Sequence, residues 1–159
     1  MHKEPALLTA TEAIQEIRTG RLSVTEWVES CITQIERYDE QIHAFSVFDP
    51  DTVRSCVKPL EERIRKGSFQ GNLYGAPVGV KDVFNTQDYS TCMGSPIWKE
   101  FTPGNDARVV FSLKEKGGIV MGKTVTAEFG VHYPGSTVNP YNIAHTPGTS
   151  SSGSAAAVA

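Results

Sequence analysis

The sequence of 159 residues lacks any apolar run long enough to cross a bilayer, and no charged segment followed by an apolar one stands at its N-terminus. We therefore expect neither a membrane span nor a secretory leader, and we expect the protein in the cytoplasm. The sequence also lacks a large excess of charge of either sign, because 15 basic residues nearly balance 18 acidic ones and leave a net charge of −3. This balance gives no electrostatic reason to expect a nucleic acid or an anionic membrane as partner.

Cysteine is rare, with Cys31, Cys56 and Cys92 far apart and without CxxC spacing. An odd number of scattered cysteines predicts free thiols in a reducing compartment, and we expect these thiols to be buried. His132 and His145 share one loop-like segment without a cysteine or glutamate at ligand spacing. The sequence therefore predicts no metal site, and nothing in it indicates a cofactor.

The first seventy residues are typical of a helical scaffold. Thr9 is the expected cap of a helix over residues 10–18, and Ser23 with Glu26 forms the pattern of a capping box at the start of a second helix. Residues 42–48, with a lone histidine at His43 that we interpret as structural or solvated, are expected to form a short strand. A third helix is expected over residues 52–66. The second helix carries an apolar stripe at three- and four-residue steps, which predicts one buried face: Val24, Trp27, Val28, Cys31, Ile32, Ile35 and Tyr38.

The residues from 71 onward have the rhythm of an α/β domain. A buried strand is expected within residues 75–84, a helix starts at Asn105-Asp106 and stops at Gly117-Gly118, and an apolar strand follows over residues 119–124. The alternation of helix and β-branched strand predicts a sheet whose faces are covered by helices. One globular domain fits the length and the ordinary composition of 39% hydrophobic and 21% charged residues.

Lys81 closes the first of these strands, and two interpretations of it stay open on the pattern alone. The simpler one is a lysine that pairs with the neighbouring Asp82 and reaches water, and this interpretation is favoured. The other is a lysine that burial keeps uncharged, so that it can accept a proton near neutral pH.

Residues 147–159 crowd serines and glycines into a short loop before a run of alanines. This predicts a hydroxyl-rich loop that leads into a helix, with Ser152 or Ser154 as the cap. One alternative is a phosphate cradle, but the loop lacks the Gly-Lys-Ser/Thr ending of a P-loop. The other is a Ser/Lys catalytic pair, because Lys81 and Ser150 occupy positions that converge at one end of an α/β sheet. Thr91-Cys92-Met93-Gly94-Ser95 is a turn that could line a pocket.

The chain resembles the N-terminal part of the amidase signature family, whose members hydrolyse or transfer amide C–N groups. The resemblance covers essentially the whole chain, through Gly75-Ala76-Pro77-Val78-Gly79-Val80-Lys81-Asp82, Gly122-Lys123-Thr124 and the segment from Pro147 to Ala159. It implies an α/β fold with a mixed sheet covered by helices and present only in part. Residues 1–70 would be the helical scaffold, and residues 71–159 the start of the sheet core.

The resemblance also implies site residues. The family uses a triad of serine, a serine after a cis peptide bond, and lysine. Lys81 matches the lysine that acts as the neutral base, and Ser150 matches the cis-serine that relays the proton. Ser151 matches a neighbouring serine that supports the hydrogen bonding of the site. The resemblance therefore implies a cis bond between Thr149 and Ser150, although the family usually has glycine where Thr149 stands.

The nucleophilic serine of the family, with the N–H groups of the oxyanion hole, lies about two dozen residues beyond the cis-serine. Ser152 and Ser154 do not match its motif, so residues 1–159 are expected to be inactive by themselves. The resemblance implies an amidohydrolase that acts on a small-molecule amide. The alternatives are the amidase subunit of a tRNA-dependent amidotransferase and a non-catalytic homologue. Residues 124–129 favour the stand-alone enzyme.

Overall fold

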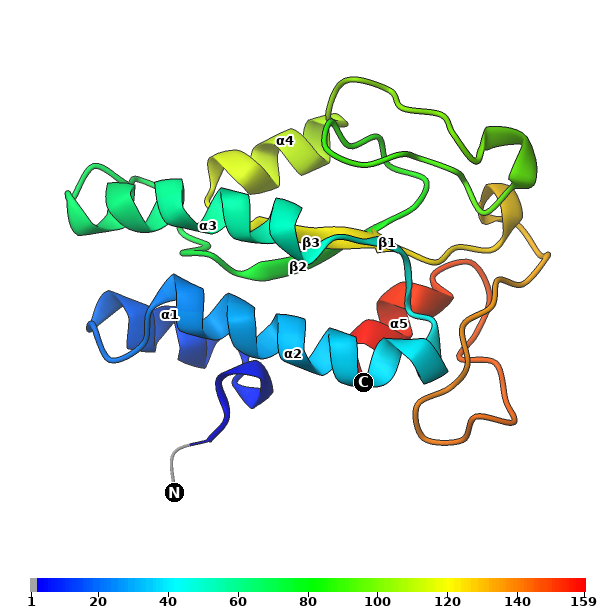
Figure 1. The fold of residues 1–159 in the computed structure, drawn as a ribbon, viewed down its shortest axis with the longest axis horizontal. Coiled ribbons are helices and arrows are strands. Elements are labelled where there is room, and N and C mark those ends of the chain that lie inside the picture. Colours follow the sequence, from blue (N-terminus) through cyan, green and yellow to red (C-terminus); the bar gives the residue numbers. More distant parts are fainter. Residues whose placement is uncertain (1–2) are drawn as a thin grey trace.

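The computed structural model describes residues 3–159, which form a small mixed sheet with helices on both faces (Figure 1). The predicted α/β fold is confirmed. The helices and strands are α1 (Ala10–Arg18), α2 (Val24–Ile42), β1 (Phe45–Phe48), α3 (Pro50–Arg65), β2 (Pro77–Lys81), α4 (Arg108–Glu115), β3 (Ile119–Thr124) and α5 (Ser152–Val158), with short 3-10 turns at Pro5–Leu7, Pro96–Trp98 and Glu128–Gly130.

The strand β3 is the centre of the sheet, whose order is β1-β3-β2. Its neighbour β2 runs parallel to it, with Lys81 opposite Thr124, and β1 runs antiparallel on the other side. All six residues of β3 are buried. A buried central strand with apolar residues on both faces is what a sheet covered by two layers requires.

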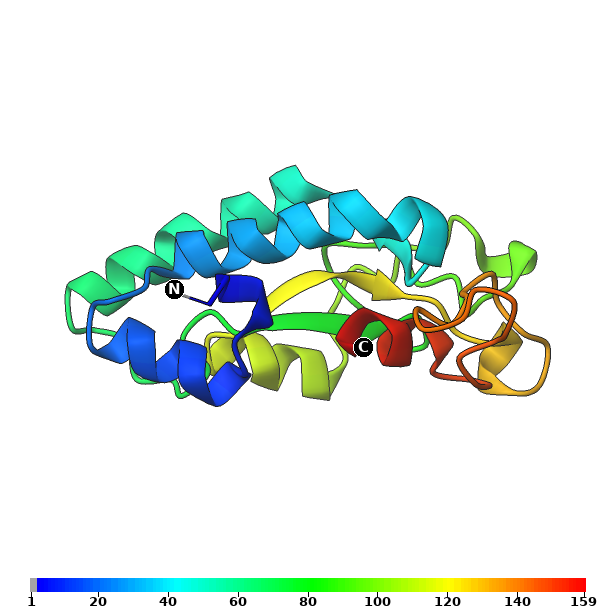
Figure 2. The ribbon, with the colours of Figure 1, turned by 90° about the horizontal axis from the view of Figure 1, so that it is seen from below.

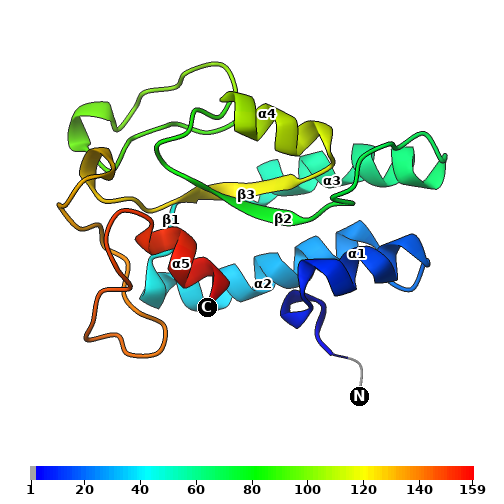
Figure 3. The same cartoon turned by 180° about the vertical axis from the view of Figure 1, so that it is seen from behind.

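Two apolar clusters cover the two faces of the sheet. The larger one joins α1, α2 and α3 to the sheet through side chains such as Trp27, Val53 and Met121. The smaller one lies under α4 and includes Val80, Val110 and Val120. Figures 2 and 3 show α3 beside α2, and α5 on the same side of the sheet as α1 and α2.

The predicted starts of the first two helices are confirmed, whereas the third helix begins at Pro50, two residues before the expected start. Thr9 with Glu12, and Ser23 with Glu26, each form a reciprocal capping box, in which side chain and backbone satisfy each other. The stripe on α2 is buried at four of its seven positions: Val24, Trp27, Val28 and Ile32. Tyr38 is the exception, because 48% of it is exposed, and its ring lies beside the Arg37 guanidinium at 5.1 Å.

Several predicted boundaries were wrong by two or three residues. The strand expected over 42–48 begins at Phe45, because α2 continues through Ile42 and ends at His43 in a left-handed conformation. The left-handed backbone of His43 ends α2, which agrees with the interpretation of this histidine as structural. The helix α4 begins at Arg108 and not at Asn105, since the Asp106 carboxylate accepts a hydrogen bond from the backbone N–H of Gln87 and pairs with Lys114.

The expectation that the cysteines are buried was also wrong. All three are free, but Cys56 is exposed, and Cys31 and Cys92 are half-buried. Within residues 3–159 no helix is both long and apolar enough to cross a membrane.

We predict that Ser23→Ala lowers the free energy of unfolding by about 1 kcal/mol, because the N-terminus of α2 loses the hydroxyl that accepts from the Glu26 N–H. Ser23→Thr keeps the hydroxyl and should unfold near the wild-type urea midpoint. Equal losses in both variants would show that the hydroxyl at this position is not what stabilises the start of α2.

Burial, with the charge of Glu4 nearby, raises the pKa of the Cys31 thiol to about 11. The thiolate is the reactive form of a cysteine. Once the thiol pKa lies above the ambient pH, each further pKa unit lowers the thiolate fraction tenfold. In the folded protein at pH 8 we expect iodoacetamide to alkylate exposed Cys56 at least about a hundred times faster than Cys31. Mass spectrometry of timed samples measures both rates, and in urea the difference should vanish. Equal rates in the folded protein would show that the surroundings of Cys31 do not raise the pKa of its thiol.

Candidate active site

The end of β2 brings Lys81 to the serines of the C-terminal segment. The Lys81 Nζ donates hydrogen bonds to Ser150 Oγ and to Ser151 Oγ, both at 2.9 Å. Lys81 and Ser150 are half-buried, and Ser151 is exposed. Among residues 3–159 no carboxylate forms an ion pair with Lys81. The favoured interpretation of Lys81, a pair with Asp82, was therefore wrong.

The serines reach Lys81 because α5 is docked closely against the ends of β2 and β3. Gly153 donates its N–H to the Val125 carbonyl, and a Cβ at this glycine would lie only 2.2 Å from the Ala44 carbonyl oxygen. Thr124, the last residue of β3, shares a hydrogen bond with Ser154 at 2.7 Å. Only a residue without a side chain allows this approach, so Gly153 sets how close the serines lie to the sheet.

The caps expected for α5 were wrong. The helix begins at Ser152 with Ser151 as its N-cap, and no side chain bonds the first free N–H groups. The Ser151 hydroxyl accepts from Lys81 instead. Ser154 is bonded to Thr124, and the Ser152 hydroxyl is buried without a hydrogen-bond partner in the described part of the chain.

The backbone before Ser150 does not have the expected form. Every peptide bond in residues 3–159 is trans, so the expectation of a cis bond between Thr149 and Ser150 was wrong. The trans form of a non-proline bond is favoured by about 3–4 kcal/mol, and a cis bond persists only where the surroundings force it. Thr149 is exposed, and Ser150 reaches Lys81 with the trans backbone.

Asp82 is bound by the other lysine of the sheet. Its Oδ1 lies 2.9 Å from Lys123 Nζ, and the two side chains are 1% and 0% exposed. The ammonium also donates to the Thr91 hydroxyl and to the Ser90 carbonyl, at 2.8 and 3.1 Å. Burial lowers the pKa of Lys123, and the Asp82 carboxylate opposes this effect.

Lys123 is the residue whose importance the sequence analysis missed. The sequence pattern named it only within Gly122-Lys123-Thr124, one of the segments that carry the family resemblance. The available signal was its place in an apolar strand, because a lysine inside a strand that is buried on both faces must find an acceptor. The turn at residues 91–95 lies beside this pair, since Cys92 donates its N–H to Asp82 Oδ1 and Met93 donates its N–H to the Asp82 carbonyl.

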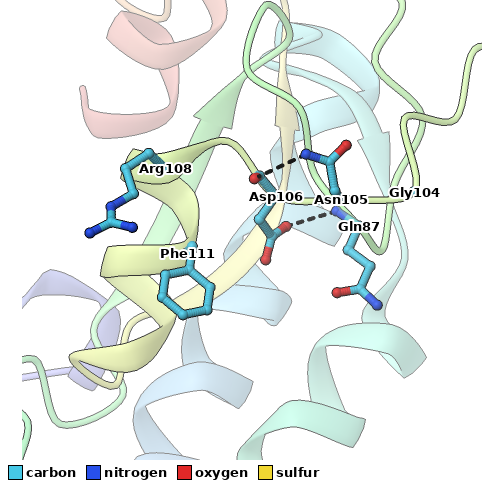
Figure 4. Close-up of a pocket in the computed structure, with 6 residues that line it drawn as sticks. All are labelled: Gln87, Gly104, Asn105, Asp106, Arg108 and Phe111. Carbon is cyan, nitrogen blue, oxygen red and sulfur yellow. Dashed lines mark hydrogen bonds between the residues drawn. The ribbon is translucent and has the colours of Figure 1, made fainter.

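The cavity in Figure 4 is separate from these serines. It lies at the start of α4, where the Asp106 carboxylate accepts from the Gln87 N–H, and Lys81 and Ser150 do not line it. Its lining residues are Gln87, Gly104, Asn105, Asp106, Arg108 and Phe111. His132 and His145 are exposed, and the described residues contain no group of three potential ligands that could hold a metal ion.

Comparison with known proteins identifies similar chains. The family model described as Amidase matches residues 26–159. AmiD of Mycobacterium tuberculosis H37Rv, whose name assigns it to the amidases, is 36% identical over 156 residues, which is 96% of this chain and 33% of AmiD. One subunit of the glutamyl-tRNA(Gln) amidotransferase of Lachnospira eligens is 36% identical over 157 residues, which is 95% of this chain and 33% of that protein.

Among solved structures, the native peptide amidase of Stenotrophomonas maltophilia matches with a TM-score of 0.87 and 28% identity. The match covers 98% of this chain and 34% of the peptide amidase. The chain therefore spans about a third of the length of these relatives.

The buried pair gives a prediction for stability. Lys123→Met should lower the free energy of unfolding by about 3–5 kcal/mol, because it leaves the Asp82 carboxylate buried without its counter-charge. The double variant Asp82→Asn/Lys123→Met removes both charges and should recover most of this loss in urea unfolding. A double variant as unstable as the sum of its single variants would contradict this account of the pair.

Proposed function

The chain belongs to the amidase signature family, and from this membership we propose that the protein hydrolyses the amide bond of a small molecule, with Lys81 as the base and Ser150 as the proton relay. The observation that carries the proposal is the hydrogen bond of 2.9 Å between Lys81 Nζ and Ser150 Oγ, two residues 69 positions apart in the chain. Ser151 Oγ accepts a second hydrogen bond from the same Nζ, also at 2.9 Å.

The chemistry follows from what these groups can exchange. An uncharged Lys81 amine accepts the proton of the Ser150 hydroxyl, while Ser150 takes the proton of a nucleophilic serine. That serine attacks the amide carbonyl, and the proton returns along the same path to the leaving nitrogen. Water then hydrolyses the acyl-enzyme. Lys81 is bound by two hydroxyls, and among the described residues no carboxylate forms an ion pair with it.

The nucleophile and the oxyanion hole belong, in this proposal, to sequence beyond residue 159. Ser152 and Ser154 do not serve, since the first is buried and the second is bonded to Thr124. A base and a proton relay cannot cleave an amide without a nucleophile, because the groups of such a triad work as a unit. We therefore propose that a polypeptide of residues 1–159 has no amidase activity.

A second candidate is the amidase subunit of a tRNA-dependent amidotransferase. The relative from Lachnospira eligens is as similar to this chain as AmiD is, at 36% identity. The two functions differ in what they need, because the stand-alone enzyme hydrolyses a free amide without partner subunits. Amide hydrolysis by the purified full-length protein alone would favour the first function. A non-catalytic homologue would hydrolyse none.

In the full-length protein, Lys81→Met should lower kcat/KM for amide hydrolysis by about a thousandfold or more, because the proton of the nucleophile has no acceptor. Ser150→Ala should have a similar effect. Lys66→Met is the matched control, since Lys66 is an exposed lysine at the far end of α3 that pairs with Glu62. Circular dichroism checks that each variant is folded. A folded Lys81→Met variant with wild-type turnover would refute the assignment.

A further inference from the structure

Asp82, the residue after Lys81, forms hydrogen bonds through both its backbone and its side chain. Asp82 donates its N–H to the Thr124 carbonyl at 3.0 Å, and its own carbonyl accepts from the Met93 N–H at 3.0 Å. Its carboxylate binds Lys123 Nζ at 2.9 Å and the Cys92 N–H at 3.1 Å. Asp82 thereby connects the end of β2 to the end of β3 and to the turn at residues 91–95.

Lys81 and Asp82 use opposite sides of the chain. The Lys81 side chain binds Ser150 and Ser151 beside α5, whereas the Asp82 side chain binds Lys123 and the turn. Successive side chains of an extended strand point to opposite faces, which accounts for this division. The buried pair therefore touches no residue that binds the proposed base, and any effect it has on Lys81 passes through the backbone.

Two consecutive residues of β3, Lys123 and Thr124, contact the segment that carries the base and the helix that follows the relay. Lys123 binds Asp82, the neighbour of the base, and Thr124 binds Ser154 of the helix that follows the relay. Both ends of the contact between Lys81 and Ser150 are therefore positioned by the same two residues of β3. The relative placement of base and relay depends on how the end of β2 is fixed against β3.

A buried ion pair is a poor way to gain stability, because desolvation of two charges can exceed their attraction, and an apolar pair of similar volume often does as well. Such a pair does have one property that apolar side chains lack. Its hydrogen bonds are directional, and here the ammonium has three acceptors that fix its position: Asp82 Oδ1, Ser90 O and Thr91 Oγ1.

We propose that Asp82 and Lys123 are positioning residues, which hold the end of β2 so that Lys81 Nζ stays within hydrogen-bond reach of Ser150. The inference rests on the proposed function, since it assigns a role in the same proton transfer. A displacement of about 1 Å at a reacting group can cost a hundredfold in rate. We therefore expect the pair to act mainly on kcat.

The test uses the full-length protein and separates positioning from stability. The variant Asp82→Asn/Lys123→Met has no unpaired buried charge, so we expect it to fold. We expect its kcat for amide hydrolysis to fall about 10- to 100-fold, with KM changed less than about threefold. A folded double variant with wild-type kcat would overturn the proposal, since the pair would then serve the fold alone.

A second variant covers the case in which the double variant does not fold. Asp82→Glu keeps the charge and the pair but adds one methylene, so it moves the strand end without leaving Lys123 unpaired. We expect kcat to fall at least about tenfold at unchanged KM, and wild-type kcat would count against the proposal. The control is Glu29→Gln/Arg54→Met, which removes an ion pair of 2.8 Å between α2 and α3 and should leave kcat unchanged.

Lys81→Met, measured beside these variants, tells the two failures apart. If folded Lys81→Met is fully active, the proposed function itself is wrong. If Lys81→Met is inactive while the folded Asp82 and Lys123 variants keep wild-type kcat, the function stands and only the positioning role is refuted.

Discussion

The parallel pairing of β2 with β3 is the constraint on which the rest of the molecule depends. It places Lys81 opposite Thr124 at one end of the sheet, where α5 also docks. Because β3 is buried on both faces, its two neighbours and the helices above and below are all positioned by one strand. The Lys81–Ser150 contact joins two distant parts of the chain, and it exists because both parts are held against β3.

Two lysines near the same sheet end have opposite surroundings. Lys123 is fully buried and is matched to a carboxylate, so its charge is compensated where no water reaches it. Lys81 is half-buried and is matched to two hydroxyls. A carboxylate favours the charged form of an amine, whereas a hydroxyl can also donate a hydrogen bond to the neutral form. The difference between the two sites lies in the acceptors, since the side chains are the same.

The features that the sequence predicted well are those with local causes. The two capping boxes depend on residues three apart, and the strand over residues 119–124 depends on a short apolar run that follows a pair of glycines. The errors have non-local causes. Tyr38 fits the helical stripe but stays half exposed, and Asp82 follows Lys81 in sequence yet binds a residue 41 positions away, on the opposite side of the strand.

The sequence by itself determined the family, the order of helices and strands, and the candidates Lys81, Ser150 and Ser151, because these follow from local patterns and from motif resemblance. Only the tertiary structure decided which lysine pairs with Asp82, that Ser151 and not Ser152 or Ser154 is the N-cap of α5, and that the bond before Ser150 is trans. Pairing across a sheet depends on strand register and on which face each side chain occupies. These are properties of the assembled sheet, and no local stretch of sequence encodes them.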